Sequence, residues 1–166
     1  MTIPQSQSNS LAAAQAWGKI GDCYVAWGAI EPDQYTNAAP YYRKVLGARG
    51  ASGAAKSEAR FNLGAVLEKQ AALKSGDEQT DLLKQAWNAY VDAFYQDLRD
   101  PDKASPLWTK KAAMQAGQLA ETLQEWQSAY CMYSQVKTLL PVMTPVCEKK
   151  MQKAFEHGAS PERCEL

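Results

Sequence analysis

The stretch AWGKIGDCYVAW, at residues 16–27, places Trp17, Ile20, Gly21 and Tyr24 at helical spacing. Side chains three and four residues apart lie on the same face of an α-helix. Such a face has two explanations: it belongs to one helix of a repeating scaffold, or it is an aromatic surface that holds a small ligand. The rest of the sequence favours the scaffold, because the same arrangement recurs twice more.

The remainder of the chain is predicted to be helical. Ala, Gln, Leu, Lys and Glu dominate it, and apolar residues recur at steps of three and four, which is the helical period. Loop-forming stretches divide the chain into blocks, and in one of them Ser105 is the expected N-cap and Pro106 the first helical residue. The expected helices span about residues 10–28, 37–47, 55–74, 79–99, 105–122, 125–140 and 145–157.

The helices form pairs, and the pairs share one order of residue types. A glycine in the first helix of each pair precedes large, small, aromatic and small apolar positions in the second helix. The glycines are Gly21, Gly64 and Gly117. The second helices carry Tyr35, Ala38, Tyr42 and Val45, then Leu83, Ala86, Tyr90 and Ala93, then Trp126, Ala129, Tyr133 and Val136. We expect the glycines and alanines to let the paired helices approach closely. Tyr42, Tyr90 and Tyr133, one turn further along, are expected to fill the wider gap between repeats.

This order resembles the W-x₂-L-G-x₂-Y…A-x₃-F…P pattern of the tetratricopeptide repeat (TPR) family over about residues 14–141. The resemblance implies an all-α fold in which about three TPR-like hairpins stack into an α-α superhelix, because one short pair cannot bury its apolar face alone. The expected repeat domain spans 10–158, between a disordered tail at 1–9 and a flexible tail at 159–166. The long loops between repeats are most similar to those of bacterial cell-envelope TPR proteins.

The repeats depart from the family pattern in length and in composition. A standard repeat has about 34 residues, and the third repeat, at about 110–143, is the one that matches this length. Arg60 stands where a large apolar residue is usual, and Ala113 occupies the matching place in the third repeat. Pro40 requires its helix to begin near Asn37, because a proline is tolerated only in the first turn.

A C-terminal helix at about 145–157 is expected to close the open end of the repeats, as a capping helix does. Its apolar side chains would face inward and its charged side chains outward. The inward set is Val146, Met151, Ala154 and Phe155, and the outward set is Lys149, Lys150, Lys153 and Glu156.

The amino-acid composition argues against two classes of protein, nucleic-acid binders and proteins that insert into a membrane. The 166 residues carry 18 Lys plus Arg and 18 Asp plus Glu, whereas a nucleic-acid binder normally has a basic excess. No uninterrupted apolar run is long enough to span a bilayer, so membrane insertion is not expected. Residues 1–10 show no signal peptide. Two compartments remain open: the periplasm or cell envelope if a signal has been removed, and the cytoplasm otherwise.

The four cysteines, at 23, 131, 147 and 164, show no C-x-x-C spacing, and His157 is the single histidine. The usual zinc patterns therefore fail, and neither a metal nor another cofactor is expected. Cys147 and Cys164 flank the C-terminal helix and would pair if the tail folds back. Free thiols, buried or half-buried, are the alternative that we favour.

No catalytic constellation is apparent in the sequence. His157 is expected to lie at a helix end beside Gly158, where a donor suits the unpaired carbonyls. Cys23 is expected on a packed helix, where a thiol is usually inert. The stretch GARGASG, at 47–53, lacks the Lys-Ser/Thr of a phosphate-binding loop and is interpreted as a linker. The sequence therefore predicts a protein that is not an enzyme.

The family resemblance implies that side chains of the first helix in each pair line a concave groove for a peptide. The aligned positions are Asp22, Glu58, Phe61, Lys69, Lys111, Met114 and Gln118. These positions carry charges of both signs and two apolar residues, Phe61 and Met114. Such a lining suits a helix, or a peptide of mixed composition, better than an acidic tail. Asp22 and Ala65 stand where the carboxylate clamp of TPR co-chaperones needs amide or basic side chains. For any single position, a solvated helix face is the simpler interpretation.

The predicted function is a non-enzymatic adaptor that binds a peptide or helix of a partner protein in this groove. Trp27 and Trp108, near helix ends, are expected to be exposed aromatic anchors for that interface. The alternative is a cell-envelope helical module in which these two tryptophans stack on a glycan or another flat ligand. Self-association through the ends of the superhelix is a third hypothesis, compatible with either.

Overall fold

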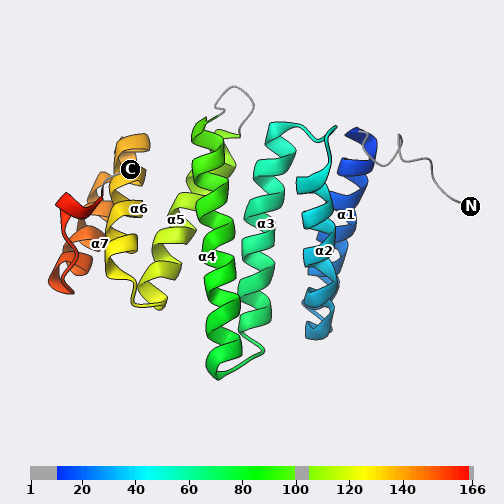
Figure 1. Ribbon diagram of the computed structural model, residues 1–166, viewed down its shortest axis with the longest axis horizontal. Helices are drawn as coiled ribbons and strands as arrows, with labels where there is room; N and C mark the ends of the chain where they lie inside the picture. The colour runs from blue at the N-terminus through cyan, green and yellow to red at the C-terminus, as the bar shows by residue number, and fades with distance from the viewer. Residues whose placement is uncertain (1–10, 100–104, 165–166) are drawn as a thin grey trace, which may run out of the picture.

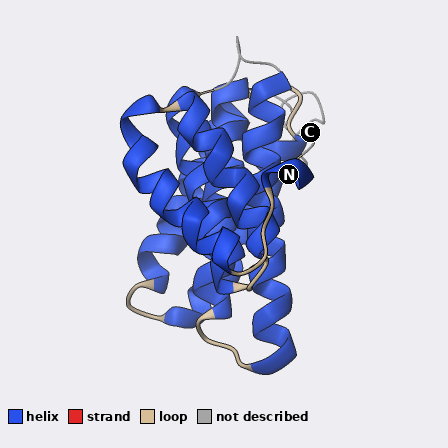
Figure 2. Ribbon diagram, turned by 90° about the vertical axis from the view of Figure 1, so that its left-hand side faces the viewer, coloured by secondary structure: helices blue, strands red, loops and turns tan. Residues whose placement is uncertain are grey.

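The computed structural model describes residues 11–99 and 105–164, and every regular element in these ranges is a helix (Figures 1 and 2). The expected tail at 1–9 and most of the loop at 100–106 lie outside the described residues. The α-helices are α1 (Leu11–Gly28), α2 (Tyr35–Gly47), α3 (Gly53–Ala71), α4 (Gly76–Arg99), α5 (Pro106–Thr122), α6 (Trp126–Leu139) and α7 (Thr144–Glu156). Three short 3-10 helices are η1 (Pro32–Gln34), η2 (Pro141–Met143) and η3 (Pro161–Arg163). The all-α prediction is confirmed.

Helices that follow one another in the chain also lie side by side, from α1 at one end of the molecule to α7 at the other (Figure 1). In addition, α3 contacts both α1 and α5. The helices α1, α3 and α5 therefore form one side of the molecule, and α2 and α4 pack behind them. This arrangement puts the first helix of each predicted pair on a common face.

A tyrosine ring lies directly against each of the three repeated glycines. A Cβ atom added at Gly21, Gly64 or Gly117 would stand 2.7 Å from a ring carbon of Tyr42, Tyr90 or Tyr133, respectively. Carbon atoms in contact are normally about 3.5–4.0 Å apart, so any larger residue would push the ring away. The close approach expected from the sequence is therefore present, but the tyrosine fills the space that the glycine leaves within its own helix pair, whereas the sequence pattern placed it in the gap between repeats.

Each of these tyrosines is buried, and its hydroxyl donates a hydrogen bond to an acid on the partner helix. Tyr42 Oη donates to Asp22 Oδ1 at 3.0 Å, and Tyr90 Oη donates to Glu68 Oε1 at 2.5 Å. Tyr133 donates in the same way to Glu121. A buried hydroxyl without a partner would be costly, so the acid makes the tyrosine acceptable in the core.

The second helices bury the positions that the repeat pattern marks. The alanines of this pattern and the tyrosine after each of them are 2% exposed or less, and the small apolar residue that follows is buried too. These are Ala38, Tyr42 and Val45 in α2, Ala86, Tyr90 and Ala93 in α4, and Ala129, Tyr133 and Val136 in α6. Together with residues of α3 and α5 they form one continuous core.

Pro40 lies deeper inside its helix than the sequence indicates. Helix α2 begins at Tyr35, directly after the 3-10 turn Pro32–Gln34, so Pro40 is not in the first turn. The proline has no N–H to donate to the carbonyl of Thr36, which lies one turn earlier. Both residues are exposed, so water can bond that carbonyl and the helix continues.

Helix α7 does not face the core as expected. Its buried residues are Cys147 and Ala154, with Met151 half-buried, whereas Val146 and Phe155 are 45% and 56% exposed. The inward assignment of those two residues is wrong. The inward face consists of Cys147, Met151 and Ala154, and Val146 and Phe155 flank it on opposite sides, since they are nine residues apart on the helix. Lys150 and Lys153, expected to face outward, both bind Glu121 on α5.

The C-terminal segment folds back on α6 in the described residues 159–164, where a flexible tail was expected. Ala159 is buried, and the side-chain amide of Gln127 bonds the backbone of Ser160 in both directions, at 2.8 and 2.9 Å. Cys164 then forms a disulfide with Cys131. The favoured expectation of free thiols is wrong at 131 and 164, and so is the alternative in which Cys164 pairs with Cys147. Cys147 is free and buried.

The glycine contacts can be tested with two alanine substitutions in α1. Gly21→Ala should lower the free energy of unfolding by about 1–3 kcal/mol, because the new methyl displaces the ring of Tyr42. Gly18→Ala is the matched control: a Cβ there meets nothing within 4 Å, so the helix should gain up to about 1 kcal/mol. Chemical denaturation measures both, and a Gly21→Ala protein at least as stable as wild type would contradict the contact.

The disulfide can be tested with Cys164→Ser. Loss of the cross-link should destabilise the protein by about 2–4 kcal/mol, and reductant should shift the denaturation midpoint of wild type but not of the variant. Peptide mapping without reduction should recover the linkage of Cys131 to Cys164. Recovery of a Cys147–Cys164 linkage instead would contradict this placement of the tail.

Candidate functional site

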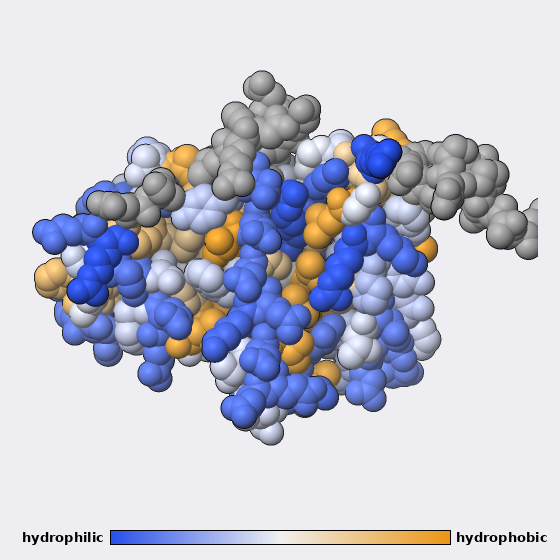
Figure 3. Space-filling view, viewed as in Figure 1, coloured by the Kyte–Doolittle hydropathy of each residue, from blue (hydrophilic) through white to orange (hydrophobic). Residues whose placement is uncertain are grey.

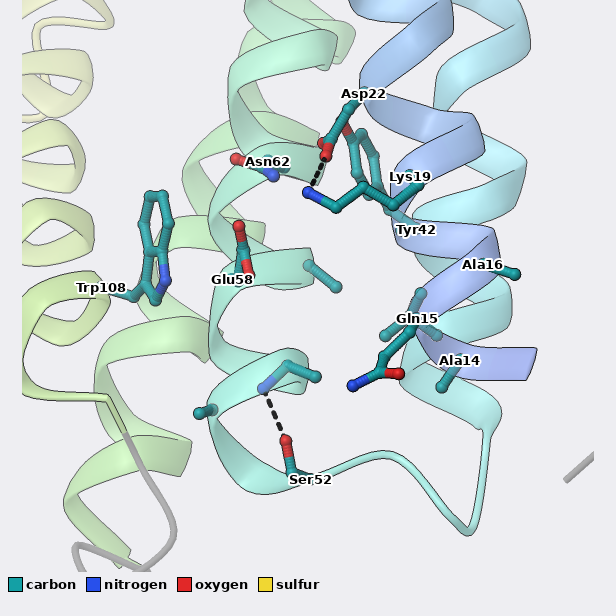
Figure 4. Close-up of a pocket in the computed structure, with 15 residues that line it drawn as sticks. Ala14, Gln15, Ala16, Lys19, Asp22, Tyr42, Ser52, Glu58, Asn62 and Trp108 are labelled. Atoms are coloured by element: carbon teal, nitrogen blue, oxygen red, sulfur yellow. Dashed lines mark hydrogen bonds and ion pairs between the residues drawn. The ribbon is translucent and has the colours of Figure 1, made fainter. Parts of the chain in front are cut away.

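A cleft of about 610 Å³ opens between α1 and α3, and Trp108 of α5 contributes to its lining (Figure 4). Lys19 and Asp22 project into it from α1, and Glu58 and Asn62 face them from α3. The short chain between α2 and α3 bounds its lower end, where Ser52 caps α3 by accepting a hydrogen bond from the Ala55 N–H at 3.2 Å.

A second cleft, of about 460 Å³, lies between α3 and α5. Its lining combines aromatic, cationic, amide and thioether side chains from α3 and α5 with two apolar residues that follow α6. They are Phe61, Lys110, Lys111, Met114, Gln115, Gln118, Leu140 and Met143. The ring of Phe61 packs against the ring of Trp108, with centroids 5.1 Å apart. Since Phe61 lines the second cleft and Trp108 the first, this aromatic pair joins the two. We call both clefts together the odd-helix groove.

Six of the seven residues predicted for the partner groove line the odd-helix groove. Asp22 and Glu58 belong to the α1–α3 cleft, and the α3–α5 cleft holds Phe61, Lys111, Met114 and Gln118. Lys69 is the exception. It lines neither cleft, and its ammonium lies 5.2 Å from the ring centroid of Tyr35 on α2, at the end of α3 where the groove has closed.

The two predicted aromatic anchors lie in different surroundings. Trp27 is 47% exposed and stacks on Tyr24 of its own helix, with ring centroids 6.1 Å apart. Trp108 is half-buried, and Lys111 holds its ammonium 4.6 Å above the indole ring. The structure places Trp108, but not Trp27, on the lining of the groove. A flat ligand therefore does not meet both tryptophans in either cleft.

The two carboxylates of the α1–α3 cleft, Asp22 and Glu58, differ in their contacts. Asp22 accepts hydrogen bonds from both Tyr42 and Lys19, the latter at 3.3 Å, so its carboxylate serves the fold. Glu58 is half-buried in the same cleft and approaches Tyr42, whose pKa rises because of burial and then because of Asp22 and Glu58. Glu58 is thus less engaged in the fold than Asp22, and Lys111 is an exposed cation on the aromatic side of the groove.

At the other end of α5, Glu121 joins three helices. Besides Tyr133 of α6, it binds Lys150 at 2.6 Å and Lys153 at 2.9 Å, both from α7. Burial alone would raise the pKa of Glu121, but the hydrogen bonds from Lys150, Tyr133 and Lys153 outweigh it and lower the pKa to about 2. Lys153 also lies over the ring of Trp126, which stacks on His157 with centroids 4.0 Å apart. These charges hold α7 in place and are not available to a ligand.

Sequence reasoning missed the acid beneath each tyrosine. Asp22 was assigned to a groove, and Glu68 and Glu121 were assigned no role. A signal was present, because Glu68 and Glu121 each stand four residues after the repeated glycine and hence on its face of the helix. In the first repeat the acid directly follows the glycine instead, so the pattern is visible in only two of the three repeats.

The described residues contain no group of three His, Cys, Asp or Glu side chains placed to hold a metal ion. His157 lies at the C-cap of α7 beside Gly158, whose φ is +91°, as expected for a helix end. Cys147 is buried next to the core, and burial raises the pKa of its thiol. In the part of the chain that the structure describes, no helix has the length and apolar character needed to cross a membrane.

No protein-family model matches this sequence, and no curated protein resembles it significantly.

The ion pairs of Glu121 predict a specific pH dependence of stability. The folded-state pKa of about 2 lies below the ordinary carboxyl pKa of 4.5, so this stabilisation is complete above pH about 4.5 and is lost as the pH falls toward 2. Glu121→Gln should therefore lose about 2–3 kcal/mol of unfolding free energy at neutral pH and show a flatter profile at acid pH. The exposed Glu162→Gln is the control. A Glu121→Gln profile parallel to that of wild type would contradict the assignment.

Proposed function

We propose that this protein is a TPR-like adaptor without enzymatic activity, whose helix pairs stack into a superhelix and bind a peptide or helix of a partner protein in the odd-helix groove. The observation that carries the proposal is the threefold recurrence of one inter-helix contact: a glycine on α1, α3 or α5 beneath a tyrosine of the next helix. Repeated helix pairs of this kind produce extended faces rather than single pockets.

The shape of the groove supports a long ligand. Its two clefts lie one after the other across three helices and are joined by the pair Phe61–Trp108. An extended peptide or one helix can lie across both. The opposite face offers less: Figure 3 shows hydrophilic side chains over α4, with hydrophobic ones confined to strips on either side of it.

The chemistry of the groove supports a partner of mixed character. Glu58 offers a carboxylate in the α1–α3 cleft, and Lys111 holds its ammonium over the rings of Phe61 and Trp108, where the two clefts join. Met114 adds an apolar contact in the α3–α5 cleft. Apolar anchors beside charges of both signs suit an amphipathic segment that carries both basic and acidic residues. The aromatic and thioether side chains would supply most of the affinity, and the charges would fix the direction of the segment.

The disulfide between Cys131 and Cys164 supports a role in an oxidising compartment, because disulfides persist there and are rare in the cytosol. We therefore include the bacterial cell envelope in the proposal. The glycan alternative receives less support, since Trp27 and Trp108 do not share a cleft.

Two experiments compare the odd-helix groove with the surface of α4: photo-crosslinking and charge reversal. A photo-crosslinking amino acid at Gln118, which is exposed in the groove, should capture a protein partner that the same amino acid at Asn88 on α4 does not capture. Lys111→Glu should weaken binding of that partner about tenfold, or 1.4 kcal/mol, whereas Lys84→Glu on α4 should leave it unchanged. Equal capture at both positions, or equal effects of both reversals, would exclude the groove as the site.

A further inference from the structure

Helix α1 carries an unbroken apolar stripe on the side that faces away from α2 and α3. Its members recur at steps of three and four residues, so they lie on one narrow face. They are Ala12, Ala16, Ile20, Cys23, Trp27 and, in the turn after the helix, Ile30, and all six are exposed. We call this face the α1 stripe. Ala16 also borders the α1–α3 cleft, but Figure 4 shows its side chain pointing away from α3, while Lys19 and Asp22 point toward the cleft.

The same face is covered in the other two repeats. When the helices are aligned on Gly21, Gly64 and Gly117, the middle of the α1 stripe corresponds to positions that are 9% exposed or less in α3 and α5. These are Ala59, Leu63 and Val66 in α3, and Ala112, Ala116 and Leu119 in α5. There the preceding helix, α2 or α4, packs against the face. The α1 stripe is therefore a helix-packing surface whose covering helix is missing in the described residues.

The α1 stripe carries no charge. The charged residues of α1 are Lys19 and Asp22, which pair with each other beside the stripe. A surface of this kind gains little from a charged partner and requires an apolar helix face opposite it. In the part of the chain that the structure describes, the α1 stripe is itself an apolar helix face of this length. It can therefore cover the same stripe on a second copy of the chain.

We propose that two copies of this chain form a two-fold dimer in which the α1 stripe of one copy packs against the α1 stripe of the other. Two-fold dimers with self-complementary faces are the commonest oligomers. A helix of 18 residues is roughly 27 Å long. Packed against its copy it would bury on the order of 1,000 Å², the lower limit of a specific interface. The chain has no net charge, so two copies do not repel each other.

Other occupants of the α1 stripe fit less well. Residues 1–10, which precede α1, lie outside the described residues and include two large apolar residues, Met1 and Ile3. Helix α7 also exposes two large apolar residues, Val146 and Phe155, but they lie on opposite sides of the helix, and Val146 is accompanied by Lys149 and Glu156. Packing α7 against the α1 stripe would join unlike faces and produce open chains instead of a dimer.

The position of Cys23 makes the proposed geometry measurable. It is the exposed free cysteine of the chain, since Cys131 and Cys164 are paired and Cys147 is buried. Its burial on a packed face, expected from the sequence, is wrong, because no helix in residues 11–99 and 105–164 covers this side of α1. Cys23 lies near the middle of the α1 stripe. In a two-fold pair of stripes, a residue near the middle lies close to its own copy.

Light scattering on a concentration series of the full chain, under reducing conditions, tests the interface. Wild type should approach twice the 18.3 kDa of one chain at high concentration. Ile20→Glu should remain at the mass of one chain, because it places a carboxylate in the stripe, and Phe155→Glu on α7 is the matched control that should still dimerise. The proposal would be overturned if wild type kept the mass of one chain at every concentration, or if its mass grew beyond two chains. Dimerisation of Ile20→Glu would overturn it as well.

A short bifunctional maleimide provides an independent readout that does not depend on a destabilising change. It should join two wild-type chains through Cys23 into one species of twice the mass, and Cys23→Ser should abolish that species. Dilution to concentrations at which light scattering finds single chains should also abolish it. Absence of the cross-linked pair at dimeric concentrations would overturn the placement of α1 against α1.

Discussion

The contact on which the fold depends is a tyrosine ring seated on a glycine of the preceding helix. The ring occupies the volume that any Cβ would need, so the two helices meet at the distance and angle that the ring sets. Because the contact recurs at Gly21, Gly64 and Gly117, each pair of helices takes a similar geometry. A fourth contact of this kind, between Gly28 and Tyr35, fixes the turn from α1 into α2. The core is thus built from one local device used several times, with alanines filling the remaining close approaches.

Each glycine–tyrosine contact brings a phenol hydroxyl into the core, where the hydroxyl needs a hydrogen-bond acceptor. In all three repeats a carboxylate on the odd-numbered helix supplies it. Burial, together with the neighbouring carboxylate, raises the pKa of Tyr42, Tyr90 and Tyr133, so these phenols remain neutral donors. The carboxylates then connect the core to other parts of the molecule. Asp22 holds Lys19 at the edge of the groove, and Glu121 holds two lysines of α7 and so orients the last helix.

The sequence predicts the features that depend on helical period and residue size, and fails where a few long-range polar contacts decide. All seven helices and the close approach of the paired helices at the glycines follow from spacing, since period and side-chain volume are local properties. The contact of each tyrosine with the glycine of its own pair was not predicted, because the spacing placed the rings between repeats. The groove residues come from the family resemblance instead, and six of the seven line the two clefts; the side chain of Lys69 lies against the ring of Tyr35. The contacts of Lys150 and Lys153 depend on ion pairs across 29 and 32 residues, and the pairing of Cys131 with Cys164 depends on a tail held by Gln127. Neither leaves a periodic trace in the sequence.

The two ends of the row of helices differ in a way that follows from the same packing rule. Every helix between them is covered on both sides, so its apolar residues are satisfied by neighbours. At the C-terminal end, Glu121 holds two lysines of α7, and the exposed residues Val146 and Phe155 lie on opposite sides of that helix among charged residues. At the N-terminal end, α1 has one lysine and one aspartate, which neutralise each other, and its outer side keeps the composition of an internal helix. An internal face on a terminal helix requires another apolar surface to cover it, and in this molecule that requirement belongs to α1 rather than to the groove that we assign to a partner.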